Sequence, residues 1–259
     1  MSGRVLCTRA ENVATVTLSN PGKLNAIDFA MWQSLAGIVA ELSGDDQLRC
    51  VIVRGDGDQA FAAGGDIEEF LSRRDTVDRA MAYHAQAGAA LQALADCRQP
   101  TIALLQGACI GGGLEIAAQC DLRICAQSSR FGAPINRLGF SMYPAEMASL
   151  LRLAGPACLL EILLEGRILG ATEALAKGLV TRVVADADVV DEAYTSARRI
   201  CAGAPLVARW HKQWLRRLQQ GGPLSDEELR ASFAFLDSDD YREGLAAFME
   251  KRKPQFTGR

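Results

Sequence analysis

Two glycine-rich turns constrain this chain more than any other feature. One reads A-F-A-A-G-G-D-I at residues 60–67, and the other reads G-A-C-I-G-G-G-L-E at residues 107–115. Each is typical of a strand that ends where a helix begins, which leaves backbone N–H groups without intrahelical acceptors. Two such turns that converge can hold the oxygen of a carbonyl as it gains negative charge. Glu115 follows the second turn, where it can move a proton. The pattern favours an enzyme that acts beside a carbonyl.

The glycine triplet at residues 111–113 does not fit the nucleotide-binding motifs. A Walker loop needs Gly-Lys-Ser/Thr after its glycines, and Leu-Glu follows here; the third glycine of G-x-G-x-x-G is also missing. A purely structural alternative remains, in which the triplet is a tight turn that packs a helix against a strand. In that alternative the helix dipole favours the negative charge of Glu115 in the first turn, and Asp66 caps the next helix.

Composition and charge exclude several classes of function. The chain has 259 residues, a formal net charge of −3, 49% hydrophobic and 23% charged residues, as in an ordinary globular protein. No basic region or known motif indicates nucleic-acid binding. The first residues do not form a secretory signal, and no long uncharged apolar run predicts a membrane span. We therefore expect a cytoplasmic protein with no nucleic-acid or membrane partner.

The cysteines and histidines do not predict a metal site. The eight cysteines lie in apolar segments without C-x-x-C spacing, so buried reduced thiols are expected. His84 and His211 lie in helical patterns without metal-ligand spacing, and we expect each to be a surface or packing residue.

The pattern of apolar residues predicts an α/β fold. Short strands are expected at residues 13–18, 50–54, 101–105 and 122–126, with helices at 28–42, 77–95 and 114–119 between them. This order favours crossover units. From residue 155 onward the pattern is mainly helical. Helices are expected at 156–164, 172–177 with Thr172 as N-cap, 188–202, 205–219, 225–236 and 239–251, and one strand at 180–184.

Six segments, in order along nearly the whole chain, resemble the enoyl-CoA hydratase/isomerase (crotonase) family. The segments are N-P-G-K-L-N-A-I at 20–27, A-F-A-A-G-G-D-I-E-E at 60–69, Q-P-T-I-A-L-L-Q-G-A-C-I-G-G-G-L-E-I-A-A-Q-C-D-L-R-I at 99–124, F-G-A-P-I-N-R-L-G at 131–139, A-T-E-A-L-A-K-G-L-V at 171–180, and D-D-Y-R-E-G-L-A-A-F-M-E-K-R-K-P-Q-F at 239–256. Any one of them is weak, but six in the right order are a specific match.

The resemblance implies a fold and an assembly. It implies a spiral core of ββα units over residues 1–200 and a C-terminal helical region over residues 201–259 that drives formation of homotrimers, often paired as hexamers. It also implies an acyl-CoA thioester as substrate, with the CoA group as part of the substrate and no separate cofactor or metal.

Matching motif to motif, the resemblance assigns roles to single residues. Gly65 and Gly112 would donate their N–H groups to the thioester oxygen and so stabilise an enolate. Glu115 matches the glutamate that activates water in the family's hydratases. The remaining matches concern CoA binding: Ala63, Asp66 and Ile67 along the pantetheine, Lys23 and Leu24 near the adenine, and Lys251 reaching the CoA phosphate of a neighbouring subunit.

One position departs from the hydratase pattern. The second glutamate normally follows the proline of F-G-x-P-E, and Ile135 stands there; Asn136, the next residue, is neither an acid nor a base. The run after Gly139 contains two new polar residues, Tyr143 and Glu146. Glu146 could substitute for the missing carboxylate, or Tyr143 could serve another enolate reaction, or both could be ordinary loop and helix-start residues.

From these observations we expect an enoyl-CoA hydratase-like lyase that forms and quenches a thioester enolate. Two alternatives stay open. One is another reaction of the same family, either decarboxylation of a malonyl-type acyl-CoA or isomerisation of an enoyl-CoA. The other is a catalytically silent CoA-binding protein that lost its chemistry with Ile135.

Overall fold

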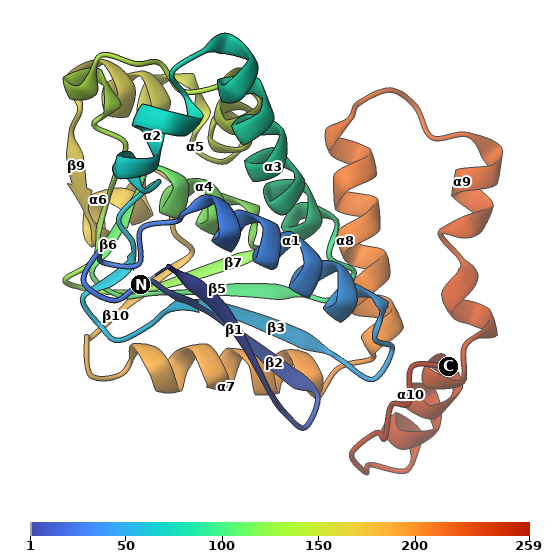
Figure 1. Ribbon diagram of the computed structural model, residues 1–259. Coiled ribbons are helices and arrows are strands. Elements are labelled where there is room, and N and C mark those ends of the chain that lie inside the picture. The colour runs from blue at the N-terminus through green and yellow to red at the C-terminus, as the bar shows by residue number, and fades with distance from the viewer. Residues whose placement is uncertain (1) are drawn as a thin grey trace.

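A six-stranded sheet lies at the centre of the structure, a computed structural model that describes residues 2–259 (Figure 1). The strand order is β1-β2-β3-β5-β7-β10. β1 and β2 are antiparallel, and all other neighbours are parallel. The strands are β1 (Arg4–Ala10), β2 (Val13–Ser19), β3 (Cys50–Gly55), β5 (Thr101–Leu105), β7 (Leu122–Ala126) and β10 (Arg182–Val184).

A second sheet of four short strands lies beside the first, in the order β4-β6-β8-β9. Its strands are β4 (Ala60–Ala62), β6 (Ala108–Ile110), β8 (Arg130–Gly132) and β9 (Ile168–Gly170). The pairs β3–β4, β5–β6 and β7–β8 each place one strand in the large sheet and the next in the small sheet. Helices follow each pair, so the chain repeats a ββα unit three times. This confirms the predicted α/β fold with ββα units.

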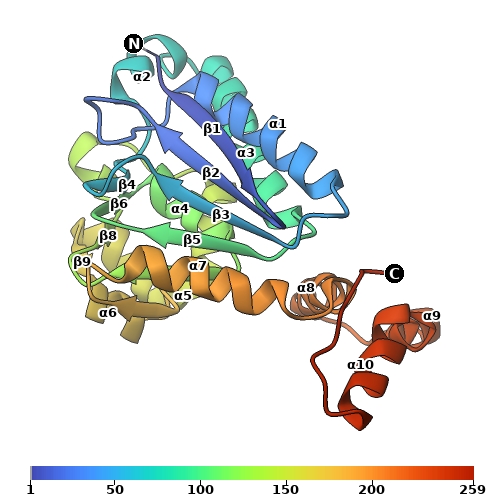
Figure 2. The same ribbon diagram turned by 90° about the horizontal axis from the view of Figure 1, so that it is seen from below.

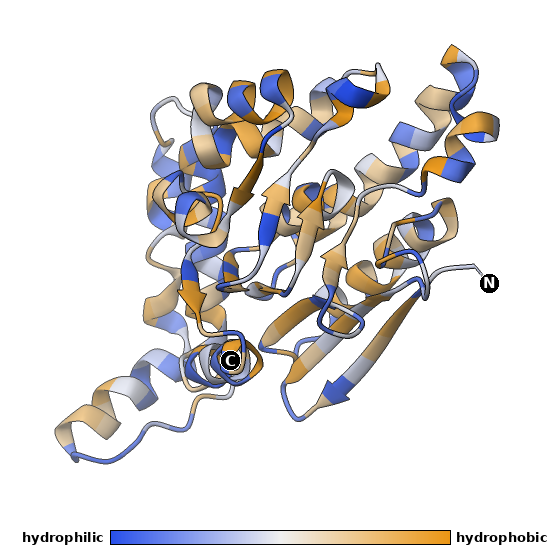
Figure 3. Cartoon of the chain, turned by 90° about the vertical axis from the view of Figure 1, so that its left-hand side faces the viewer, coloured by the Kyte–Doolittle hydropathy of each residue, from blue (hydrophilic) through white to orange (hydrophobic). Residues whose placement is uncertain are grey.

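Helices cover both faces of the large sheet (Figures 1 and 2). α1 (Phe29–Gly44), α3 (Val77–Asp96) and α4 (Gly112–Gln119) lie on one face, and α7 (Val189–Cys201) lies on the other. Adjacent residues of one strand enter different cores: Val51 packs in the larger cluster, and Ile52 packs against the α7 side. The strands are accordingly largely apolar, whereas the helices mix apolar and polar residues (Figure 3).

α5 (Pro144–Glu165) is long and apolar enough, by length and composition alone, to cross a membrane. In this fold it packs against α4, and core residues such as Leu150 and Ile162 belong to it. Gly155 has a non-helical backbone (φ 74°, ψ 171°), which divides α5 into two helical halves. The sequence predicted only the second half. The first half escaped prediction, and it carries Glu146.

Three helices form an arm that extends away from the sheets (Figures 1 and 2). They are α8 (Pro205–Gln219), α9 (Asp226–Ala231) and α10 (Asp239–Met249), with the 3-10 turn η2 (Ala234–Asp237) between the last two. Large apolar side chains stay exposed on this arm: Leu215 and Phe233 are 63% and 58% exposed, and Phe248 and Met249 are 80% and 79% exposed.

Three expectations need correction. Thr172 lies inside α6 (Ala171–Ala176), whose N-cap is Gly170, because the preceding strand β9 already ends at that glycine. Cys7 is exposed and Cys201 is partly exposed, whereas the other six cysteines are buried; all eight are free thiols. His84 is more than a surface or packing residue, since it bonds a carboxylate as described below.

Candidate active site

The two glycine-rich turns meet because the strands before them are parallel neighbours. β4 pairs with β6, and β6 pairs with β8, all in parallel, so their carboxyl ends lie at one edge of the small sheet. The chain leaves β4 into α2 (Ile67–Arg73), β6 into α4, and β8 into the 3-10 turn η1 (Ile135–Leu138). Three strand exits therefore converge on one place.

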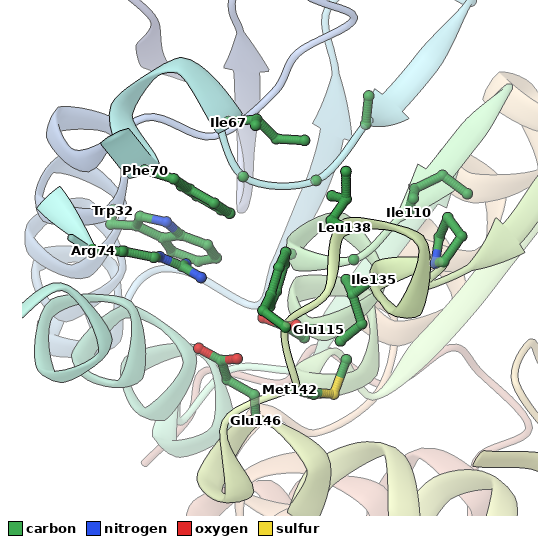
Figure 4. Close-up of a pocket in the computed structure, with 17 residues that line it drawn as sticks. Trp32, Ile67, Phe70, Arg74, Ile110, Glu115, Ile135, Leu138, Met142 and Glu146 are labelled. Carbon is green, nitrogen blue, oxygen red and sulfur yellow. The ribbon is translucent and has the colours of Figure 1, made fainter. Parts of the chain in front are cut away.

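A cavity of about 150 Å³ lies at this place (Figure 4). Six of the predicted site residues line it, namely Ala63, Gly65, Ile67, Gly112, Glu115 and Glu146. Its wall is otherwise mainly apolar, with Trp32, Phe70, Ile110, Ile135, Leu138, Phe140 and Met142 among its residues. Such a wall fits an acyl chain, and the few polar groups within it stand out.

Gly65 and Gly112 place two backbone N–H groups at the cavity wall. Gly112 begins α4 and Gly65 directly precedes the N-cap of α2, so neither N–H has an intrahelical acceptor. A methyl group built on Gly112 would lie 3.6 Å from the Gly65 nitrogen, which shows how close the two turns are. Two neighbouring N–H groups are engaged elsewhere: Asp66 donates to the Ile27 carbonyl, and Gly111 donates to the Gly132 carbonyl.

Glu115 lies in the first turn of α4 and is only 6% exposed. Burial in this apolar wall raises the pKa of its carboxyl well above the usual value, and the nearby charge of Glu146 raises it further. Arg74 opposes this shift with its positive charge. The carboxyl therefore holds a proton more strongly than a free glutamate does.

Glu146 lies in the first turn of α5, 6% exposed, and enters the same cavity. His84 of α3 contacts it, with 2.6 Å between His84 Nδ1 and Glu146 Oε1. Tyr143 stacks on the His84 ring, with ring centroids 4.6 Å apart and planes tilted by 20°. This stack holds the imidazole that in turn fixes the carboxylate.

Arg74, the C-cap residue of α2, is the positively charged residue in the cavity wall. Its guanidinium carbon lies 3.9 Å from the centroid of the Phe70 ring and 4.1 Å from that of Tyr83. Within residues 2–259, Arg74 forms no ion pair, and its buried Nε has no hydrogen-bond acceptor. Figure 4 shows Arg74 beside the space into which Glu146 and Glu115 point.

The other predicted site residues lie away from the cavity wall. Lys23 Nζ contacts Asp66 Oδ2 and Glu68 Oε2, each at 2.7 Å, and these carboxylates raise the pKa of Lys23. Asp66 is the N-cap of α2, as its purely structural alternative predicted. Leu24 is 48% exposed in a left-handed conformation (φ 48°), and its carbonyl accepts a hydrogen bond from Ala63 N–H.

Two further predicted residues are not in the wall. Tyr143 is 41% exposed and contacts His84 from outside. Lys251 follows α10. This helix belongs to the C-terminal arm, away from α2 and α4 (Figures 1 and 2).

The sequence reasoning missed the role of two residues of the site. His84 and Arg74 belong to segments with no recognisable motif, and they reach the site only because α2 and α3 fold over it. The signal available for His84 was weak: it is one of only two histidines, and its helix carries several other polar residues.

Comparison with known proteins agrees with the fold. A solved structure from Magnetospirillum magneticum, described as an enoyl-CoA hydratase/carnithine racemase, matches with a TM-score of 0.97 and 48% identity over 98% of this chain and 96% of that one. A probable enoyl-CoA hydratase of Mycobacterium tuberculosis is 35% identical over 98% of both chains. A short-chain-enoyl-CoA hydratase of Clostridium acetobutylicum is 30% identical over 96% of this chain and 95% of its own.

The family model described as enoyl-CoA hydratase/isomerase matches residues 8–259. The chain belongs to the enoyl-CoA hydratase/isomerase family. It has the crotonase fold, and its family identifies it as an enzyme.

Proposed function

We propose that this enzyme adds water across the C=C bond of an α,β-unsaturated acyl-CoA thioester, the enoyl-CoA hydratase reaction. The observation that carries this proposal is Glu146, which enters the cavity beside Glu115. Glu146 supplies the second carboxylate, which is missing at the usual position because Ile135 stands there. The names of the relatives support hydration over the family's other reactions.

The thioester oxygen accepts hydrogen bonds from the N–H groups of Gly65 and Gly112. When a nucleophile adds at the β-carbon, electrons shift onto this oxygen and the thioester becomes an enolate. Fixed donors aimed at the developing charge stabilise it, each by about 3 kcal/mol. Ala63, Asp66 and Ile67 then line the path of the pantetheine, and Lys23 and Leu24 lie near the adenine.

Hydration needs one carboxylate and one carboxylic acid. The carboxylate removes a proton from water while the water oxygen bonds to the β-carbon, and the acid delivers a proton to the α-carbon as the enolate collapses. A close pair of carboxyls that shares one proton meets both needs. The raised pKa of Glu115 favours the assignment of this proton to Glu115. Glu146 then takes the proton from water, and Glu115 protonates the α-carbon. This exchanges the roles expected from the resemblance, which made Glu115 the base.

His84 is a positioning residue in this scheme. Its Nδ1 holds one oxygen of Glu146 at 2.6 Å, which leaves the other oxygen for water. His84→Phe should lower kcat more than it changes KM and should move the pH profile of kcat. His211→Phe is the matched control, because His211 is an exposed residue of α8. Equal effects of both substitutions on kcat and its pH profile would show that His84 does not position Glu146.

A panel of three substrates tests the reaction itself. Crotonyl-CoA reports hydration, a 3-enoyl-CoA reports migration of the double bond, and methylmalonyl-CoA reports release of CO₂. We expect hydration to be the fastest reaction. Faster isomerisation or decarboxylation would replace the proposal by that reaction, and binding without turnover of all three would indicate a silent CoA-binding protein.

We further propose that the C-terminal arm assembles the chain into homotrimers, or pairs of them. The support is the row of exposed apolar side chains on α8–α10, which includes Phe248 and Met249. Assembly would also bring Lys251 toward a neighbouring subunit's CoA. Light scattering of the purified enzyme tests the stoichiometry.

A further inference from the structure

Arg74 is a charged group in the cavity wall that the hydration scheme does not use. A guanidinium in an apolar wall is costly unless it is paired. Two carboxylates share the cavity, yet neither lies within ion-pair distance (4.0 Å) of Arg74 among the described residues. Glu146 is instead bonded to His84. Arg74 acts on Glu115 only through space, so no direct ion pair with these carboxylates accounts for its placement.

Two aromatic rings hold the guanidinium in place. Phe70 and Tyr83 lie 6.1 Å apart, nearly perpendicular at 75°, and Arg74 lies about 4 Å from each ring. The Tyr83 hydroxyl accepts a hydrogen bond from Trp32 Nε1 at 3.1 Å, which fixes this ring in turn. Contact with aromatic faces orients a guanidinium and leaves its N–H edge available. The Nε of Arg74 is buried and has no hydrogen-bond acceptor among the described residues.

We propose that Arg74 binds a carboxylate carried by the acyl group, so that the preferred substrates are CoA thioesters of dicarboxylic acids. A planar guanidinium matches the two oxygens of a carboxylate, and paired charged hydrogen bonds are the strong ones. This inference rests on the proposed function for the location of the acyl group in this cavity. It adds the chemical class of that group.

The test measures binding separately from turnover. Glutaryl-CoA and pentanoyl-CoA are saturated five-carbon thioesters that differ in a terminal carboxylate and cannot be hydrated. We expect the wild-type enzyme to bind glutaryl-CoA about 10–100-fold more tightly by calorimetry, the usual range for a charged hydrogen-bonded pair. Arg74→Gln should reduce this ratio to about one, and Arg74→Lys, which keeps the charge without the planar edge, should restore part of it.

Arg73→Gln is the matched control. Arg73 is the neighbouring arginine, contacts the Phe29 ring at 4.2 Å, and does not line the cavity. It should keep the wild-type ratio. A wild-type ratio near one, a ratio unchanged in Arg74→Gln, or an equal fall in Arg73→Gln would each overturn the proposal.

Turnover of the matching unsaturated pair separates this proposal from the hydratase assignment. If glutaconyl-CoA and trans-2-pentenoyl-CoA both remain unhydrated while the binding ratio holds, the hydratase assignment fails and the Arg74 site stands. If both are hydrated equally and the binding ratio is near one, the hydratase assignment stands and the Arg74 proposal fails.

Discussion

Substituting Gly112 by alanine tests the oxyanion site with a single methyl group. The added carbon would lie 3.2 Å from Trp32 Cζ2 and 3.6 Å from the Gly65 nitrogen. The first contact is a few tenths of an ångström too close, and the Trp32 ring is held by its bond to Tyr83. The methyl group thus crowds the space between the two N–H donors. Loss of one such donor lowers kcat about 10²–10³-fold, and we expect that loss for crotonyl-CoA.

The stability of this variant should change much less than its activity. The backbone of Gly112 does not need a positive φ, so overpacking against Trp32 should cost about 1–3 kcal/mol of unfolding free energy. Gly88→Ala in α3 is the control, because its added carbon meets open space; it should gain about 0.5–1 kcal/mol and keep full activity. A folded Gly112→Ala enzyme within threefold of wild-type kcat would refute the placement of the thioester oxygen.

Three more predictions follow from the same contacts. The raised pKa of Glu115 means that the native state holds a proton that the unfolded chain releases above about pH 4.5, so wild-type stability is lost as pH rises through the native pKa. The melting temperature of Glu115→Gln relative to wild type should therefore climb with pH. Parallel melting curves of the two proteins across pH would contradict this. Asp28→Ala removes the N-cap of α1, which accepts from Met31 N–H at 2.8 Å and Gly3 N–H at 2.7 Å, and should cost about 1–2 kcal/mol in urea unfolding; an unchanged midpoint would contradict it. Phe248→Glu should shift the assembled enzyme toward smaller species in light scattering. An unchanged mass would show that Phe248 does not belong to the subunit interface.

Most of the large sheet could be predicted from the sequence. β3, β5 and β7 are buried on both faces, so each reads as an apolar run with turn residues at its ends. β4, β6 and β8 have only three residues each, too few to show a period. β1 was missed because its residues are mostly exposed, so it lacks an apolar alternation. The first half of α5 was missed because Gly155-Pro156 resembles a helix boundary.

The candidate site was predictable only where the local chain carries the chemistry. Gly65, Gly112 and Glu115 belong to turns that show their conformation in sequence. Glu146 could be named as a candidate, but nothing local shows that the first turn of α5 faces α4. The pairing of Glu146 with His84 joins residues 62 positions apart, and it depends on how α3 and α5 pack.

A double-mutant cycle on Glu115 and Glu146 tests most directly whether the two carboxyls act as a pair. Glu115→Gln and Glu146→Gln, each with a checked fold, should lower kcat/KM for crotonyl-CoA hydration about 10²–10⁴-fold. The effects of groups that work as a unit are not additive. The kcat/KM of the double variant should therefore lie within about tenfold of that of the less active single variant. Wild-type hydration by Glu146→Gln, or a double loss equal to the product of the single losses, would contradict the account.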